Sequence, residues 1–413
     1  MKKNFVIIVV SLLLFSCKKD KEITTEEEVV VEVDYGHEIV SADINGAKTL
    51  LLIKELVNDE MEWVIYKTTS SNTLEAVTIT TDASSGAAGR GVITVVYDVN
   101  DRYFYLSGRN FEHTHYFIDK TNGKAYPFDG ATFIYTPRWD WHQYGDFVED
   151  IFASDDEGNI YFNSENKVLR VNISNPNNIT SEVASFDQDH VSDFSIDHKG
   201  NLTYSGEYNG SRILRAISRD KSTLQQLPGS TNRSWNYRFR GADGNLYYDY
   251  DGITAINFAP FETLNYTDAS TNAGCGYRLV TVKNKNATIG VGRCSGIFHL
   301  DHDNASLEMI APWGISDVIA VRANNDHYFV AYKSGSTVKL SMADPADNVP
   351  EDLISAQYEV SGFDVTKDGD VFFSALDNQN LKTVIGKVTS SGSITVLKEG
   401  INTDIVFLAI TNL

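Results

Sequence analysis

Short runs in which apolar and polar residues alternate make up most of the chain beyond about residue 35. Two examples are residues 191–196 (VSDFSI) and 212–217 (RILRAI). A period of two places the apolar side chains on one face of an extended strand, whereas a helix repeats every 3.6 residues. No long segment of the sequence shows the helical period, so the pattern predicts an all-β fold.

Glycine-containing turns punctuate these strands at a regular interval. The four best matches are residues 156–162 (DEGNIYF), 198–204 (HKGNLTY), 243–248 (DGNLYY) and 367–373 (KDGDVFF). Asp-Gly and Gly-Asn pairs tolerate the positive φ that tight hairpin turns demand. From Gly158 onward the turns recur about every 40–44 residues, and four strands per unit at that period predict the blades of a β-propeller.

The repeated units resemble those of NHL-type and TolB-like propellers, which are built from radial four-stranded blades. The resemblance covers most of residues 35–413 and lies in the pattern of turns and strands. Residues 154–161 (SDDEGNIY) also resemble the Asp-box turn of sialidases, a structural motif that implies no sialidase activity. No set of residues carries over an active site from these families.

The two ends of the chain are expected to complete one blade together. Residues 400–410 look like a first strand that lacks its three partners, and residues 49–54, 62–67 and 74–80 look like three strands that lack a first. Pairing them would close the ring and remove its exposed edges. We therefore expect eight blades, with seven as the alternative.

The first sixteen residues have the features of a secretory signal, with a basic start and a short apolar core. The ending Leu14-Phe15-Ser16-Cys17 resembles the lipobox of bacterial lipoproteins, although Phe15 is bulkier than usual. This resemblance implies cleavage before Cys17 and a lipid on its thiol. The alternative is a plain signal peptide followed by an incidental cysteine.

A charged stretch without periodicity follows Cys17 and ends near residue 34. Such a composition predicts a flexible acidic tether. Lysines and acidic residues directly after the cysteine resemble lipoproteins of the Bacteroidetes, which implies export to the outer membrane or cell surface. The predicted organisation is a signal peptide over residues 1–16, a tether over 17–34 with lipidated Cys17, and a propeller over 35–413.

The chain carries 35 basic and 56 acidic residues, which gives a formal net charge of −21. Such a surface repels phosphate backbones and anionic lipid headgroups. We therefore expect no nucleic-acid partner and a contact with the membrane only through the lipid anchor.

Two cysteines remain when Cys17 carries lipid. In the predicted hairpin with its turn at Asn284-Lys285, Cys275 and Cys294 fall directly opposite one another across the strands. Outside the cytoplasm a disulfide between them is the expected result. Two buried free thiols and a soft-metal pair are the alternatives.

Aromatic residues concentrate in one group of loops. In propellers, the connections between blades and those between second and third strands lie on one face, which usually carries the function. The candidate ligand-binding residues on this face are Arg138, Trp139, Trp141, His142 and Tyr144 in the connection 128–147, and Arg109, Trp235 and Trp313 in other loops. Aromatic platforms suit sugar faces or extended peptides. The alternative is that these aromatics fold down into a satellite core. His115 falls on the same predicted face.

Signatures of catalysis are missing from the sequence. Neither zinc-ligand spacings nor a Gly-x-Ser-x-Gly elbow occurs, and His113-x-His115 is only a weak metal lead. The sequence therefore predicts no catalytic residue, no metal site and no cofactor.

The pattern favours a membrane-anchored binding or scaffold module for a glycan, a peptide or a partner protein. An enzyme acting on acidic polysaccharide, as several propeller lyases do, is the alternative on the same face. A lyase needs a base and a cation near the uronate, which His142 or Tyr144 could supply together with Arg138. A purely structural part of an envelope complex is a third hypothesis.

Overall fold

The computed structural model divides the chain into two units, of which the larger and compact one spans Tyr35–Leu413. The structure describes residues 38–57, 60–69, 72–82, 93–108, 115–127, 152–164, 167–171, 179–185, 188–208, 211–227, 238–249, 253–266, 277–292, 296–304, 306–310, 318–389, 391–400 and 410–412. Within these ranges the regular structure consists of strands β1–β34 and one short 3-10 helix, η1 (Lys283–Lys285).

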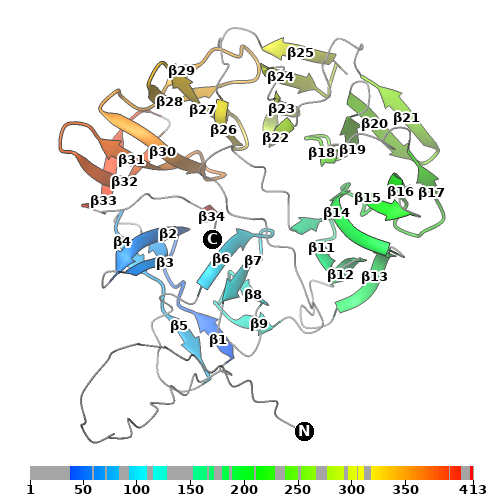
Figure 1. The fold of residues 1–413 in the computed structure, drawn as a ribbon, viewed down its shortest axis with the longest axis horizontal. Coiled ribbons are helices and arrows are strands. Elements are labelled where there is room, and N and C mark those ends of the chain that lie inside the picture. Colours follow the sequence, from blue (N-terminus) through cyan, green and yellow to red (C-terminus); the bar gives the residue numbers. More distant parts are fainter. Residues whose placement is uncertain are drawn as a thin grey trace, which may run out of the picture. The chain divides into compact units, whose positions relative to one another are not determined.

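Eight four-stranded antiparallel sheets follow one another around a ring and form an eight-bladed β-propeller (Figure 1). Blade 1 consists of β34 (Ile410–Asn412), β2 (Thr49–Val57), β3 (Glu60–Thr68) and β4 (Leu74–Ala76). Blade 2 consists of β6 (Ile93–Asp98), β7 (Tyr103–Gly108), β8 (His115–Asp119) and β9 (Ala125–Pro127). Blade 3 consists of β10 (Phe152–Ser154), β11 (Ile160–Ser164), β12 (Lys167–Val171) and β13 (Ile179–Ser185). Blade 4 consists of β14 (Gln188–Ile196), β15 (Leu202–Tyr208), β16 (Ser211–Ile217) and β17 (Leu224–Gln226).

The second half of the ring repeats the same order of strands. Blade 5 consists of β18 (Arg238–Arg240), β19 (Leu246–Asp249), β20 (Ile253–Phe258) and β21 (Phe261–Asn265). Blade 6 consists of β22 (Tyr277–Val282), β23 (Ala287–Gly292), β24 (Gly296–Asp301) and β25 (Ser306–Ile310). Blade 7 consists of β26 (Val318–Ala323), β27 (Tyr328–Ser334), β28 (Thr337–Ala343) and β29 (Glu351–Asp352). Blade 8 consists of β30 (Tyr358–Val365), β31 (Val371–Asp377), β32 (Lys382–Val388) and β33 (Ile394–Glu399). The predicted all-β fold and the count of eight blades are confirmed.

Blade 1 joins the two ends of the propeller, as the sequence predicts, although its described first strand is β34 and residues 401–409 of the predicted strand lie outside the described residues. Strand β34 pairs with β2 in antiparallel register, with Leu51 opposite Ile410 and Thr49 opposite Asn412. The ring is thereby closed by hydrogen bonds between segments about 360 residues apart. Strand β2 has a partner on this edge instead of exposing its backbone groups to solvent.

One predicted strand is divided between two sheets. Residues 74–76 form β4, but residues 79–81 form a separate strand, β5 (Ile79–Thr81), which pairs with β1 (Ile39–Ala42). The chain leaves blade 1 after Val77, whose amide still donates to the Ile65 carbonyl at 2.8 Å, and Ile79 is buried in the apolar cluster that blades 1 and 2 share. The sequence pattern did not predict this extra two-stranded sheet.

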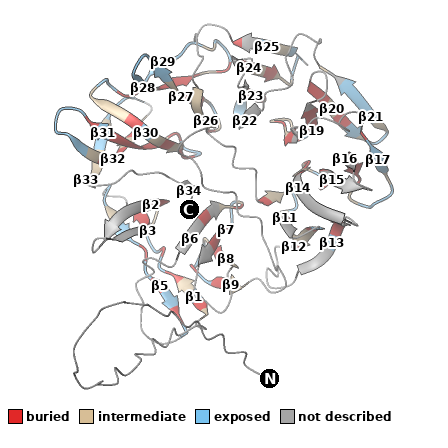
Figure 2. Ribbon diagram, viewed as in Figure 1, coloured by how far each residue is buried: buried red, intermediate tan, exposed pale blue. Residues whose placement is uncertain are grey.

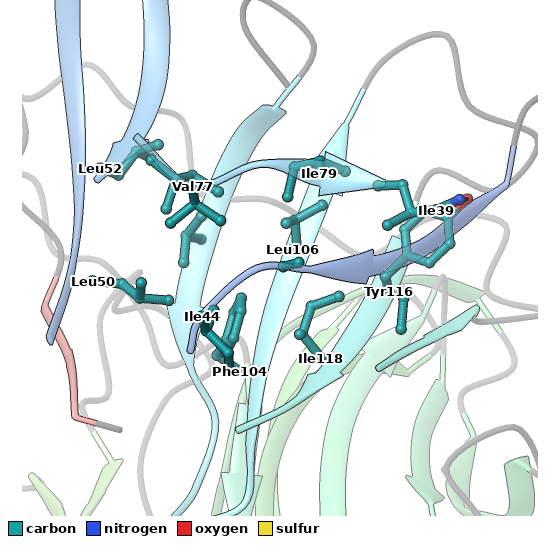
Figure 3. Packing of buried hydrophobic residues seen from close by; sticks show 14 residues of the cluster. Ile39, Ile44, Leu50, Leu52, Val77, Ile79, Phe104, Leu106, Tyr116 and Ile118 are labelled. Carbon is teal, nitrogen blue, oxygen red and sulfur yellow. Dashed lines mark hydrogen bonds between the residues drawn. The ribbon is translucent and has the colours of Figure 1, made fainter. Parts of the chain in front are cut away.

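The β1–β5 sheet packs on the junction between blades 1 and 2, as the close-up in Figure 3 shows. Ile39 and Ile79 of this sheet lie among Leu50, Leu106 and other buried side chains of the two blades. Two hydrogen bonds fasten it, from the Ala42 amide to the Gly123 carbonyl (2.9 Å) and from the Ile39 amide to the Tyr116 hydroxyl (3.2 Å). The small sheet therefore fills a wedge that the diverging blades leave open.

Apolar clusters stand at all eight junctions between blades, within the part of the chain that the structure describes. Strand β7 shows why alternation produces them: Tyr103 and Tyr105 face blade 3, whereas Phe104 and Leu106 face blade 1. Both faces of the strand are therefore buried (Figure 2). Each such side chain contributes about 1.5–3 kcal/mol relative to an exposed one.

The recurring turns have the geometry that the sequence predicts. Gly200 and Gly244 adopt positive φ of 86° and 82°. In the turn of Gly200, the Asp197 carboxylate accepts the amides of Lys199 and Asn201, each at 2.8 Å. Aspartate and glycine together fold the turn, because one supplies the acceptor and the other the left-handed backbone.

The hairpin of β22 and β23 also has the predicted register. Tyr277 pairs with Gly292 and Val282 with Ala287, and η1 forms the turn between them. This is the register that would bring Cys275 opposite Cys294. Both cysteines lie outside the described residues, as does Cys17.

Candidate functional site

The topology defines two faces of the propeller. The turns between first and second strands lie at one end of every blade, which we call the turn face. The turns between second and third strands and the connections between blades lie at the opposite end, the loop face. Each face presents a different chemistry.

On the turn face, hydrogen bonds link the turns of neighbouring blades. The Asp156 amide donates to the His198 carbonyl, and the His198 amide donates in turn to the Gly244 carbonyl, both at 2.9 Å. The Asn284 amide donates to the Asn325 carbonyl at 2.8 Å. These backbone contacts tie blades 3, 4 and 5, and blades 6 and 7, to one another independently of side chains.

Two ion pairs on the turn face join blades that are not neighbours. Arg240 of blade 5 donates to the Ser154 carbonyl and to the Asp156 carboxylate of blade 3, each at 2.9 Å. Lys367 of blade 8 pairs with Asp101 of blade 2 and thereby holds the pKa of that carboxyl below its ordinary value. The turns must converge to allow such pairs, so much of the polar capacity of this face is used within the protein.

A buried histidine completes the turn face between blades 5 and 6. The His302 side chain is 1% exposed. Its Nδ1 lies 2.9 Å from the Tyr247 hydroxyl, and its Nε2 lies 2.7 Å from Thr288 Oγ1 and 3.3 Å from the Ala242 amide. The Tyr247 hydroxyl donates onward to Asp243 at 2.7 Å.

The partners of His302 fix its tautomer. The Ala242 amide also donates to Thr288 Oγ1, at 3.1 Å, so the tautomer follows from Tyr247 instead. The Tyr247 hydroxyl gives its proton to the Asp243 carboxylate and must accept from the imidazole, whose proton is therefore on Nδ1. Burial lowers the pKa of His302, although the nearby Asp243 carboxylate opposes the shift. Both nitrogens are satisfied, so this cluster is a structural element.

A second histidine–tyrosine pair lies near the loop face, between blades 2 and 3. Tyr105 is buried on β7, and its hydroxyl lies 2.6 Å from Nδ1 of His115, the first residue of β8. The two rings are stacked, with centroids 5.9 Å apart and an interplanar angle of 23°. Phe152, the first residue of β10, also packs on Tyr105, with ring centroids 4.9 Å apart.

Within the described part of the chain, His115 forms a hydrogen bond through one nitrogen. Among the described residues, Nε2 of this imidazole has no hydrogen-bond partner, and the side chain is half-buried. Desolvation lowers the pKa of His115 to about 4, and no charged group among the described residues contributes to the shift. The ring is therefore neutral at pH 7 and retains the capacity for one more hydrogen bond.

The position of this pair connects it to the predicted site. His115 follows the connection 109–114, and Phe152 ends the connection 128–151, which contains most of the aromatic candidates. Arg138, Trp139, Trp141, His142, Tyr144, Arg109, Trp235 and Trp313 all lie outside the described residues. The structure thus describes the point where the aromatic connection joins blade 3, and there it places the Tyr105–His115 pair.

Sequence reasoning assigned His115 to the correct face but did not find its partner. The register pairs Ser107 with His115 and Tyr105 with Phe117, so Tyr105 and His115 are diagonal neighbours on one face of the hairpin. That diagonal was available from the sequence once the β7–β8 register was set. The contact with Phe152 was not, because it depends on how blade 3 packs on blade 2.

Two further observations limit the chemistry of the described part of the chain. Among these residues, no group of three or more His, Cys, Asp or Glu side chains is arranged to hold a metal ion. None of the helical structure described in these ranges is sufficiently long and apolar to cross a membrane.

Known proteins resemble this chain in structure but not in sequence. No protein-family model and no curated protein sequence matches the chain. The crystal structure of a eukaryotic initiation factor is similar with a TM-score of 0.50 and 10% identity, over 88% of this chain and 96% of the other. A streptogramin B lyase is similar with a TM-score of 0.42 and 17% identity, over 74% and 93% of the two chains. A TolB-like protein from Agrobacterium tumefaciens has a TM-score of 0.31 and 11% identity, over 63% and 89%. At such identities the similarity concerns the fold alone.

Proposed function

We propose that this protein is a lipid-anchored, extracytoplasmic binding module whose ligand is held on the loop face, above the junction of blades 2 and 3. The observation that carries the proposal is the Tyr105–His115 pair. It places an imidazole, whose Nε2 has no partner within the described ranges, at the edge of an apolar cluster between the two blades. Polar groups converging beside aromatic surface are typical of ligand sites.

The contrast between the faces supports this location. On the turn face, polar groups of the turns bond to one another across blades. At the loop-face end of blades 2 and 3, His115 keeps one nitrogen for a further partner. The aromatic connection that follows Pro127 ends at Phe152, whose ring packs on Tyr105 of this pair.

The route of the chain is compatible with a lipid anchor. The amide of Glu38 donates to the Asp82 carboxylate at 3.0 Å, at the loop-face end of β1. The propeller is thus entered at the end where the site is proposed. Lipidation of Cys17 and a location at the outer membrane or cell surface rest on the sequence. Cys17→Ser should release the protein from the membrane fraction, because a single substitution removes the acylated thiol.

Binding to an array of oligosaccharides and peptides tests the site. The mature chain is compared with a Trp139→Ala, Trp141→Ala double variant, which should lose binding at least tenfold because two aromatic platforms are removed. Leu264→Ala is the matched control, since Leu264 is 60% exposed on the outer strand of blade 5. Undiminished binding by the double variant contradicts the proposed site.

A further inference from the structure

The chemistry of the Tyr105–His115 pair also indicates which class of ligand the loop face takes. We propose that this pair selects an uncharged, hydroxyl-rich ligand, a neutral oligosaccharide, by bonding one sugar hydroxyl at His115 Nε2. The inference rests on the proposed function, because it concerns the ligand of that same site.

The pair is held in place by packing. Tyr105 is fully buried, and its ring contacts both the stacked imidazole of His115 and the ring of Phe152. Phe117, opposite Tyr105 in the β7–β8 register, packs on Phe152 at 5.6 Å. His115 therefore presents Nε2 from a preorganised position, and a ligand bonding there loses little affinity to ordering of the protein.

A neutral histidine bonded to a tyrosine can present either polarity. If the Tyr105 hydroxyl donates to Nδ1, the proton of the imidazole is on Nε2, which then donates. If Nδ1 donates to the hydroxyl oxygen, Nε2 carries the lone pair and accepts. A sugar hydroxyl both donates and accepts, so it can bond to either form. A carboxylate can only accept, and an ammonium group can only donate.

Charge argues against an acidic ligand. His115 lacks water around much of its ring, so the imidazolium form that would pair with a carboxylate is disfavoured. The chain as a whole has a formal net charge of −21, which repels polyanions at long range. A uronate polymer would therefore meet a neutral hydrogen-bonding group on an acidic protein, whereas a neutral glycan meets no such penalty.

The test is calorimetric binding of the mature chain to hexasaccharides of glucose, xylose and mannose, beside hexagalacturonate and a basic hexapeptide. We expect a neutral hexasaccharide to bind, with an affinity that changes less than about twofold between about pH 8 and pH 5.5, because His115 stays neutral there. Preference for hexagalacturonate, or for the basic peptide, overturns the inference. So does affinity that rises as the pH falls.

Two matched variants separate this inference from the proposed function. Tyr105→Phe keeps the ring but removes the hydroxyl that orients His115, and should weaken neutral-glycan binding about tenfold. Tyr103→Phe is the control, because Tyr103 is equally buried on the same face of β7 but lies toward the turn face. If both tyrosine variants bind alike while the Trp139, Trp141 double variant has lost binding, the loop-face site stands and this inference falls. If the double variant also binds normally, the proposed function falls with it.

Discussion

The two histidine–tyrosine pairs of this propeller are chemically alike but differ in how fully they are used. His302, near the turn face, bonds through both nitrogens to Tyr247, Thr288 and the Ala242 amide. His115, near the loop face, bonds through Nδ1 to Tyr105, and Nε2 has no partner among the described residues. Burial lowers the pKa of both imidazoles, so both are neutral at pH 7.

The difference shows how a repeated architecture separates stability from binding. A fully bonded buried cluster lowers the free energy of the folded state, and losing one member leaves the others unsatisfied. Removing a side chain that forms fewer internal hydrogen bonds lowers the free energy of unfolding less, and its remaining polar atom can bond to a ligand. We therefore assign His302 to the stability of the junction between blades 5 and 6, and His115 to recognition.

The largest expected effect is on the turn-face pair. His302→Ala should lower the free energy of unfolding by about 3 kcal/mol, because a buried imidazole is removed and Tyr247 and Thr288 each lose a buried hydrogen-bond partner. Denaturant-induced unfolding measures the change. A loss below about 1 kcal/mol would show that Tyr247 and Thr288 find other partners when His302 is removed. His302 would then contribute no more to stability than we expect of His115.

The proposed disulfide would strengthen the hairpin that carries Thr288. The confirmed register of β22 and β23 supports a bond between Cys275 and Cys294, and closing a loop of this size contributes about 3 kcal/mol. We expect two thiols to resist alkylation in the unreduced, secreted protein, and the unfolding transition to shift downward after reduction. Alkylation of both thiols before reduction would contradict the disulfide.

Acid should weaken the protein through both histidines. Because their folded-state pKa values lie below the unfolded value of about 6.5, the stability they contribute is fully present above that pH. It is lost as the pH falls through the folded-state values, which for His115 is about 4. Unfolding measured from pH 7.5 down to about pH 4.5 should show a shallower decline in His302→Ala than in the wild type. Parallel curves would mean that His302 binds no proton on unfolding.

The smallest expected effect concerns a hydroxyl that has no partner. Thr203 follows its turn glycine by the same spacing as Tyr161 and Tyr247, whose hydroxyls reach a turn aspartate. Thr203 is fully buried, and its Oγ1 makes no hydrogen bond with any residue that the structure describes. Thr203→Val should therefore stabilise the fold by about 1 kcal/mol, measured by thermal unfolding.

Thr288 supplies the matched control for that substitution. It is equally buried, but its Oγ1 bonds to His302 Nε2 at 2.7 Å. Thr288→Val should destabilise the protein where Thr203→Val stabilises it. Changes of the same sign in both variants would contradict the hydrogen-bond assignment.

Much of the fold could be predicted from the sequence because local rules determine it. Asp-Gly turns at a regular period set the blade count, and the hairpin turn after Val282 set the register of β22 and β23. Pairing of the chain ends followed from strands that lacked partners. The division of residues 74–80 between two sheets could not be predicted, because it depends on the wedge between blades 1 and 2 that captures Ile79.

The candidate site likewise has features that the sequence predicts and features that depend on packing between blades. The face could be predicted from strand order alone, and His115 was assigned to it. Its bond to Tyr105 depends on a diagonal within one hairpin, whereas the contact of Tyr105 with Phe152 depends on packing between blades. The His302 cluster also spans two blades, and no spacing in the sequence brings Tyr247 and His302 together.

The most direct test of the account measures stability and binding together in two variants, His302→Ala and His115→Ala. The account predicts that His302→Ala loses about 3 kcal/mol of unfolding free energy and keeps its affinity for the neutral hexasaccharide when assayed well below its unfolding temperature. It predicts that His115→Ala loses about 1 kcal/mol or less and binds at least tenfold more weakly. Loss of affinity in His302→Ala with normal binding in His115→Ala would contradict the assignment of the two pairs.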